Sequence, residues 1–389
     1  MYIKNIFRGV FSCIYQKKSV PLHENYAHMK TFFVIAGIII GIAGIALAVL
    51  AHPAFGVFRH VSQDRLIQSP NWREGMFQNQ EPTRQFTGDA GPGNIFRHFL
   101  AAGDTLRVPA TPLPAYKTDL KTLPDSTDWV VWFGHSSYLF SIGGVRVLVD
   151  PVFRLEWPST MMLRPFPGTD LYRPEDLPET DILVITHEHW DHMDYATLRD
   201  IRTKVRHVVC PLGIADYLRY WHYSDEQITE MDWGANHPLS IRHSDSISDG
   251  SLQVTCLPSR HFSNRLLLRR NRTLWASFMI ENAGKRVYIG GDGGYDKRFK
   301  EIHEQFGTID LAFLENGQYN ANWRYIHTMP EDLEQAVLDL QAEQVFTVHH
   351  DKFALSIHDW REPDSVARSI AQKHHLRLLD APIGQVVAY

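Results

Sequence analysis

The chain has 389 residues, 44% of them hydrophobic, which is enough for one large domain or two smaller ones with proper cores. Its formal net charge is −5, so no overall positive field argues for a nucleic-acid partner. Its three cysteines form no CxxC pattern and indicate no disulfide framework.

The first predicted element is a membrane-spanning helix, because residues 31–50 contain no charged side chain. Such a helix rises about 1.5 Å per residue and would span roughly 30 Å, the thickness of the hydrocarbon core of a bilayer. Basic residues precede it, and the nearest ones afterwards are Arg59 and Arg65. The positive-inside rule therefore predicts a cytoplasmic basic tail (1–30), an anchor (31–51) and a remainder of the chain that lies across the membrane, which would be periplasmic in a bacterium. A cleaved leader is the alternative.

Residues 52–127 are rich in proline and polar residues and show weak periodicity. They contain more aromatic residues than a disordered linker needs. We therefore expect an extended arm that packs on the domain formed by residues 128–389.

From residue 128 the pattern changes to short β-branched and aromatic runs, which predict strands. We expect strands at 129–133, 138–142, 145–149, 181–186, 206–210, 252–257, 275–281, 286–290, 310–314 and 344–348. We expect helices at 195–203, 212–221, 296–305, 330–342 and 363–373. Antiparallel strands come first and strands then alternate with helices. This order predicts an α/β (α+β) fold in which two sheets pack face to face between outer helices, an αββα sandwich.

The most informative motif is Thr-His-Glu-His-Trp-Asp-His at residues 186–192, directly after an apolar strand. It presents four ligand-type side chains in one turn: His187, His189, Asp191 and His192. Imidazole and carboxylate ligands suit zinc, and also iron or manganese. The motif therefore predicts a metal site at this strand end.

Three later residues also follow the ends of apolar strands, namely His261, Asp292 and His349. Each of them alone has an ordinary explanation as a hydrogen-bonded residue. Their shared placement favours a single site with two metals.

The order His-x-His-x-Asp-His, then His, Asp and His, resembles the metallo-β-lactamase superfamily. The motifs Trp-Phe-Gly-His-Ser-Ser (132–137), Arg-His-Phe-Ser-Asn-Arg (260–265) and His-Thr-Met-Pro-Glu (327–331) resemble its branch of N-acylphosphatidylethanolamine-hydrolysing phospholipase D-like proteins. The resemblance implies the αββα fold and two Zn²⁺ per chain. It implies one metal on His187, His189 and His261, a second on Asp191, His192 and His349, and Asp292 bridging both.

The last motif departs from the family, in which Val-His-Trp/Tyr-Gly-Thr-Phe is usual. Residues 348–353 read Val-His-His-Asp-Lys-Phe. The departure puts the edge of the substrate pocket in doubt, and it leaves His350 as an alternative ligand to His349.

The resemblance also implies roles for residues near the metals. Asp191 would orient a water and move its proton, and His327 would contact the leaving group or the phosphate. Tyr319 and Arg265 are expected to bind substrate. Ordinary alternatives stay open for His327, as a residue before a helix, and for Arg265, as a surface arginine.

Two further residues have two interpretations each. Asp150 either orients a ligand histidine or caps backbone amides, and His135 is either structural or a support for the ligands. The cluster Arg269, Arg270 and Arg272, beside the apolar residues 266–268, either touches anionic lipid or belongs to a solvated loop.

The sequence thus favours a zinc-dependent phospholipase D-type phosphodiesterase that is held in the membrane by residues 31–50. A lactonase or another acyl-ester hydrolase acting on a small-molecule ester is one alternative. A non-catalytic, zinc-stabilised membrane module is another. Whether the chain forms a homodimer is left open.

Overall fold

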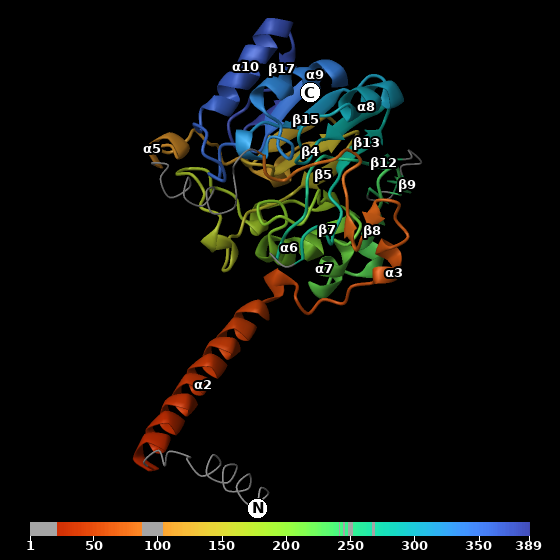
Figure 1. Cartoon of the computed structure of the whole chain (residues 1–389). Coiled ribbons are helices and arrows are strands. Elements are labelled where there is room, and N and C mark those ends of the chain that lie inside the picture. The colour runs from red at the N-terminus through yellow and green to blue at the C-terminus, as the bar shows by residue number, and fades with distance from the viewer. Residues whose placement is uncertain (1–21, 88–103, 241, 244–245, 248–251, 267–268) are drawn as a thin grey trace, which may run out of the picture. The chain divides into compact units, whose positions relative to one another are not determined.

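The computed structural model describes residues 22–87, 104–240, 242–243, 246–247, 252–266 and 269–389 (Figure 1). Most of the predicted basic tail lies outside the described residues. The chain divides into two compact units, Met1–His52 and Pro53–Tyr389. In the first unit, helix α2 (Leu22–Leu50) contains the segment Met29–Leu50, which is long and apolar enough to cross a membrane and has a mean hydropathy of 2.9. None of that segment is buried.

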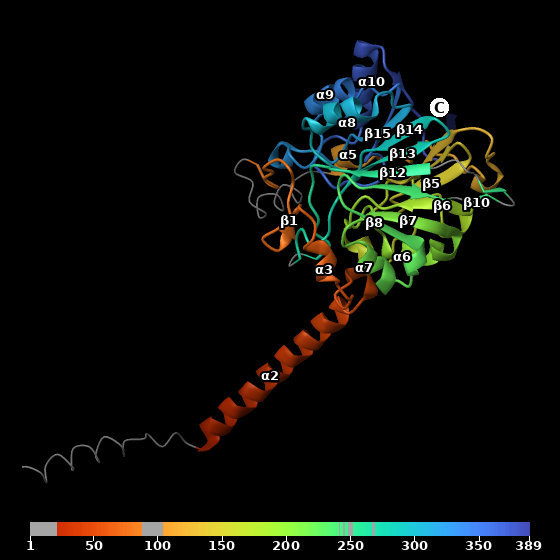
Figure 2. The ribbon, with the colours of Figure 1, turned by 90° about the vertical axis from the view of Figure 1, so that its right-hand side faces the viewer.

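The second unit contains two seven-stranded sheets, which Figure 2 shows stacked with helices outside them. The first sheet has the order β18-β3-β4-β5-β6-β7-β8. Its strands are β18 (Val386–Ala388), β3 (Trp129–Trp132), β4 (Tyr138–Ile142), β5 (Val145–Val149), β6 (Thr180–Val184), β7 (Val205–Pro211) and β8 (Ile228–Met231). Strands β5 to β8 run parallel to one another, whereas β18, β3, β4 and β5 pair antiparallel.

The second sheet has the order β17-β16-β15-β14-β13-β12-β9. Its strands are β17 (Arg377–Leu378), β16 (Gln344–Val348), β15 (Leu311–Glu315), β14 (Lys285–Ile289), β13 (Ser277–Asn282), β12 (Leu252–Leu257) and β9 (Asn236–Leu239). Strands β14 to β17 are parallel. Two short hairpins, β1 (Trp72–Arg73) with β2 (Met76–Phe77) and β10 (Arg242–His243) with β11 (Ser246–Ile247), stand apart from both sheets.

Alternation along the strands builds three apolar layers. In β3, Val130 belongs to the cluster between the two sheets, and Val131 belongs to the cluster beneath the outer helices. Helices α6 (Tyr195–Ile201) and α7 (Ala215–Tyr220) cover the first sheet. Helices α8 (Arg298–Phe306), α9 (Pro330–Leu340) and α10 (Glu362–His374) cover the second. The αββα sandwich is therefore confirmed.

The arm contacts the domain through several side chains and backbone groups. Phe77 is fully buried and its amide donates to the carbonyl of Asn271 at 2.8 Å. The Asn79 side chain donates to the carbonyl of His261 at 2.8 Å. Short helices α3 (Gln63–Leu66) and α5 (Asp104–Arg107) also lie in this region.

The parallel strands place the site. Strands β5, β6 and β7 run parallel in one sheet, and β14, β15 and β16 run parallel in the other. The carboxyl ends of parallel strands share an edge, so the residues that follow them gather there. Asp150, His187, Asp292 and His349 follow such strands, and Glu315 is the last residue of β15.

Candidate metal centre

The turn after β6 is fixed by its own backbone. The amides of His192 and Met193 donate to the carbonyl of His189 at 3.1 and 2.9 Å. Asp194 then begins α6 as its N-cap and accepts from the amide of Thr197. This tight turn allows residues two to five positions apart to point into one volume.

Glycines allow Asp292 to enter the same volume. Gly291 has φ +60°, and a Cβ there would lie 2.8 Å from the carbonyl oxygen of Ala276. A Cβ at Gly290 would lie 2.7 Å from the carbonyl oxygen of Phe313. The Gly-Gly pair is therefore required for strand β14 to pass between its neighbours and deliver the carboxylate.

The first cluster of ligand-type atoms comprises His187, His189, His261 and Asp292. Nδ1 of His189 lies 2.9 Å from Nε2 of His187 and 3.1 Å from Nε2 of His261. Both Nε2 atoms lie 3.8 Å from Oδ2 of Asp292. Four ligands about 2.05 Å from a tetrahedral zinc would lie about 3.3 Å apart, within the range of these separations.

The second cluster comprises His135, Asp191, His192 and His349, and Asp292 reaches it as well. Nε2 of His192 lies 3.5 Å from Asp191 Oδ2 and 3.1 Å from Asp292 Oδ2. Nδ1 of His349 lies 3.3 Å from the other oxygen of Asp292, Oδ1. Asp292 therefore stands between the two clusters, with one oxygen near ligands of both.

Two observations indicate that these residues fit metal ions. Nε2 of His192 and Oδ1 of Asp292 are buried and have no hydrogen-bond partner in the described part of the chain, which is costly for polar atoms unless a ligand satisfies them. The separations in the first cluster also match a coordination shell. The seven predicted ligands are brought together, and each is buried except His189, which is intermediate.

The histidines are held by groups behind them. Nδ1 of His261 donates to the carbonyl of Ile326 at 2.7 Å, which leaves the lone pair of Nε2 facing the cluster. Nδ1 of His192 donates to Oδ2 of Asp150 at 2.8 Å. Asp150 also accepts from the amide and hydroxyl of Thr186 at 2.8 and 2.6 Å. Asp150 therefore accepts from a backbone amide and also holds the ring of His192, which is a predicted ligand.

His327 lies beside the clusters and is coupled to a buried carboxylate. It groups with Asp292 and His349 among the ligand-type side chains. Its Nδ1 donates to Oε1 of Glu315 at 2.6 Å. Burial raises the pKa of Glu315 to about 7. Although burial opposes it, the charge of Glu315 raises the pKa of His327 above its ordinary value.

His135 is a site residue that the predicted ligand set omitted. It is fully buried, and its Nε2 lies 2.8 Å from Oδ2 of Asp191. Its backbone has φ +54°. The His135 amide donates to the carbonyl of His350, and the His349 amide donates to the carbonyl of His135, so two backbone hydrogen bonds join His135 to the loop after β16. The signal in the sequence was its position in a Gly-His-Ser-Ser turn at a strand end.

The prediction that Arg265 binds substrate is wrong. Its side chain is buried and donates to the carbonyls of Ala54, Glu188 and Met193 at 2.6, 2.9 and 2.8 Å. The guanidinium carbon lies 3.9 Å from the centre of the Trp190 ring. Arg265 therefore holds the turn that contains residues 187–192 through hydrogen bonds to the carbonyls of Glu188 and Met193.

Tyr319 is the second residue that was expected to bind substrate. It is 3% exposed, and its ring stacks on that of His358 with centroids 4.5 Å apart. Burial and stacking hold the ring in place, and the expected contact of Tyr319 with substrate stays a prediction.

The structure explains the unusual motif at residues 348–353. His350 stays outside the metal-capable clusters, and its ring lies 4.8 Å from that of Trp132. Lys352 is buried and donates to the carbonyls of Phe133 and Val152 at 3.2 and 2.9 Å. These residues tie the last ligand loop to the first sheet, and His349 is the histidine that faces the clusters.

Comparisons with known proteins agree with this geometry. Residues 145–350, more than half of the chain, match the family described as the Beta-lactamase superfamily domain. An uncharacterized protein of Mycobacterium tuberculosis is 35% identical over 329 residues, which cover 82% of this chain and 84% of the relative. The N-acyl-phosphatidylethanolamine-hydrolyzing phospholipase D 1 of Caenorhabditis elegans is 26% identical over 311 residues, which cover 74% of this chain and 84% of that protein.

A solved structure shows the same fold. The crystal structure of CmlA, a diiron beta-hydroxylase from Streptomyces venezuelae, matches with a TM-score of 0.51 at 20% identity, over 68% of this chain and 54% of that one. Together with the sandwich and the His/Asp clusters at its strand ends, these matches show that the chain belongs to the metallo-β-lactamase superfamily.

Proposed function

We propose that the chain is a membrane-anchored hydrolase that binds two zinc ions and cleaves a phosphodiester bond of lipids similar to N-acylphosphatidylethanolamine. The observation that carries hydrolysis is the convergence of seven ligand-type side chains from four strand ends. The proposed ligands of one ion are His187, His189 and His261, those of the other are Asp191, His192 and His349, and Asp292 lies between them.

Zinc ions bound there would lower the pKa of a water and stabilise negative charge on phosphoryl oxygens. Asp191 is suited to orient that water. Its Oδ2 is fixed by His135, whereas within the described residues its Oδ1 accepts no hydrogen bond and can accept one from a water. Its side chain retains 12% exposure, so substrate can reach it.

His327 is the proposed proton donor to the leaving oxygen. Glu315 holds its Nδ1 and favours the protonated ring. The imidazole remains 13% exposed beside the ligands, so its other nitrogen can approach a substrate. Glu315 acts through His327 and is a positioning residue.

The lipid substrate is supported by two observations of different kinds. A relative that aligns over 74% of the chain is named for hydrolysis of N-acyl-phosphatidylethanolamine. The apolar segment Met29–Leu50 would keep the enzyme beside a bilayer, with the basic N-terminal tail on the cytoplasmic side and the catalytic unit on the other.

A turnover assay tests the proposal. The zinc-loaded full chain would be incubated with a lipid panel that includes N-acylphosphatidylethanolamine and a lactone, and products would be identified by mass spectrometry. We expect a phosphatidic acid, released by addition of water across the phosphorus–oxygen bond, and loss of this product in Asp292→Asn. Opening of the lactone without phosphatidic acid would replace the phosphodiesterase with an acyl-ester hydrolase.

A further inference from the structure

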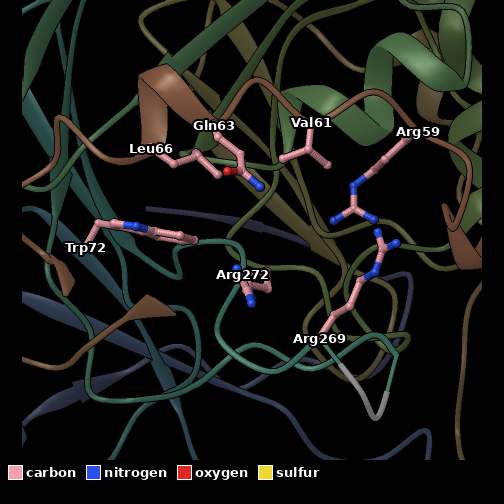
Figure 3. A pocket seen from close by; sticks show the side chains of 7 residues that line it. All are labelled: Arg59, Val61, Gln63, Leu66, Trp72, Arg269 and Arg272. Carbon is pink, nitrogen blue, oxygen red and sulfur yellow. The ribbon is translucent and has the colours of Figure 1, made fainter. Parts of the chain in front are cut away.

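A cavity separate from the metal centre lies in the arm. It has a volume of about 440 Å³ and is lined mainly by Arg59, Val61, Leu66 and Trp72 of the arm and by Arg269 and Arg272 of the loop before β13 (Figure 3). None of these residues belongs to the proposed ligand set or to the metal-capable clusters. The cavity is therefore a second concave site, and the metal chemistry makes no use of it.

The cavity is strongly cationic. Arg59 donates to the carbonyl of Gly56 at 2.8 Å, and Arg269 donates to the carbonyl of the next residue, Val57, at 3.4 Å. Two guanidinium groups are thus anchored to adjacent carbonyls, and Figure 3 shows them pointing toward one another. Arg272 completes the set, with its guanidinium carbon 5.8 Å from the centre of the Trp72 ring.

No carboxylate in the described part of the chain forms an ion pair with any of these three arginines. The neighbouring Arg65 behaves differently, because it pairs with Asp216 at 2.8 Å and also with Glu230. Arg59 is only 7% exposed, and its Nε is buried and has no hydrogen-bond partner among the residues that the structure describes. Like charges held together without a counter-charge repel one another, and an anion between them would relieve that cost.

The surroundings indicate where such an anion comes from. Phe58 and Ile67, which are sequence neighbours of the cavity residues Arg59 and Leu66, are 58% and 57% exposed. Arg59 follows the end of the apolar helix at Leu50 by fewer than ten residues, so the cavity residues come soon after the proposed membrane anchor along the chain. Exposed apolar residues beside clustered arginines are typical of a surface that meets anionic lipid.

We propose that this arginine pocket binds the phosphate of an anionic phospholipid headgroup at the surface of the bilayer that holds α2. Guanidinium groups suit this ligand because they donate paired hydrogen bonds to phosphate oxygens. The lipid would be a fixed partner that orients the catalytic unit on the membrane, distinct from the lipid that is hydrolysed. The inference rests on the membrane anchor of the proposed function and is independent of the substrate.

Hydrogen exchange on the full chain in lipid nanodiscs tests the pocket. Discs of phosphatidylcholine alone would be compared with discs that also contain phosphatidylglycerol, following peptides that cover residues 59–72 and 269–275. We expect exchange in these peptides to slow at least threefold when phosphatidylglycerol is present. In Arg269→Gln/Arg272→Gln the apparent affinity for the lipid should fall about fivefold for each arginine removed.

The matched control is Lys300→Gln/Arg377→Gln, which removes the same charge from exposed positions on α8 and β17. It should respond like the wild type. Arg272→Lys keeps the charge but loses the paired donors, so an intermediate loss is expected, and this variant serves if the double variant folds poorly. Unchanged protection in both pocket variants, or no effect of phosphatidylglycerol on the wild type, would overturn the proposal.

Two further measurements distinguish binding of free phosphate from binding of lipid, and failure of the pocket from failure of the metal centre. Inorganic phosphate added to phosphatidylcholine discs should give no protection, and equal protection would make the pocket a site for free phosphate. Hydrolysis of the soluble diester bis(p-nitrophenyl) phosphate in the same discs reports on the metal centre alone. Turnover without lipid-dependent protection would refute only the pocket, whereas protection without turnover would refute only the hydrolase.

Discussion

The carboxylate of Asp150 offers a sharp test of the proposed metal centre, because it holds the proposed ligand His192 and is not itself a proposed ligand. In Asp150→Asn the oxygen of the amide can still accept from the Thr186 amide, but its NH₂ group cannot accept the proton of His192 Nδ1. The favoured tautomer of His192 then carries its proton on Nε2, which is the nitrogen that faces Asp191 and Asp292. A protonated Nε2 cannot bind a metal.

The expected loss follows from this geometry. Residues that orient metal-binding histidines typically contribute 10- to 100-fold to metal affinity, or about 1.4 to 2.7 kcal/mol. The substitution also leaves buried donors poorly matched, which costs roughly 1–3 kcal/mol of folding free energy. The control variant must therefore lose a similar folding free energy but keep its metal affinity.

Asp194→Asn is that control. Asp194 is as buried as Asp150 and also accepts three hydrogen bonds, from the Thr197 amide at 3.0 Å, the Thr197 hydroxyl at 2.6 Å and the Ser159 hydroxyl at 3.1 Å. It bonds no ligand histidine. Zinc affinity would be measured by competition with a chelator, and the stability of each metal-free variant by urea unfolding.

We expect both variants to lose similar stability and only Asp150→Asn to lose zinc affinity by at least tenfold. Wild-type affinity in Asp150→Asn would refute the reasoning. Equal losses of affinity in both variants would show a general effect of destabilisation.

Three further results are expected. His327→Gln should lower kcat about 100-fold with little change in KM or zinc content, because it removes only the proposed proton donor. Steady-state kinetics and metal analysis would measure these quantities. An unchanged kcat would exclude His327 as the proton donor. Gly291→Ala should lower the free energy of unfolding by about 2 kcal/mol more than Gly284→Ala. Both glycines have positive φ, but only the Cβ at residue 291 would clash with a neighbouring backbone atom. Equal losses in urea unfolding would contradict this prediction. Burial lowers the pKa of Lys352 to about 8, so between pH 8 and 10.5 the unfolded chain binds more protons than the folded one, and stability rises with pH. The unfolding free energy of wild type relative to Lys352→Met should therefore increase by about 3 kcal/mol from pH 7 to pH 10.5, and a pH-independent difference would show that Lys352 stays charged in the fold.

The sequence predicts much of the fold because the central strands carry strong apolar runs. Strands β4, β5, β12 and β16 have the predicted bounds, and each of the other predicted strands and helices is present with shifts of a few residues. Within the two large sheets the missed strands are β8, β9, β17 and β18, and these are the four edge strands. Strand β9 contains Pro238, and β17 has two residues, so neither carries an alternating pattern.

Some residues of the candidate site could likewise be predicted from the sequence, and others could not. All seven proposed ligands stand just after apolar strands, so their positions along the chain predict their meeting. The role of His135 depends on a contact with Asp191 that spans two strand ends, which no local pattern reports. Arg265 was misread because a buried arginine and a substrate-binding arginine look alike in sequence, and only its three carbonyl partners distinguish them.

The most direct test of the central claim is anomalous diffraction at the zinc edge from crystals of the zinc-loaded protein. We expect two peaks about 3.5–4 Å apart. One peak would lie against His187, His189 and His261, and the other against Asp191, His192 and His349, with Asp292 touching both. A single peak, or peaks away from these side chains, would rule out a two-zinc centre at these residues.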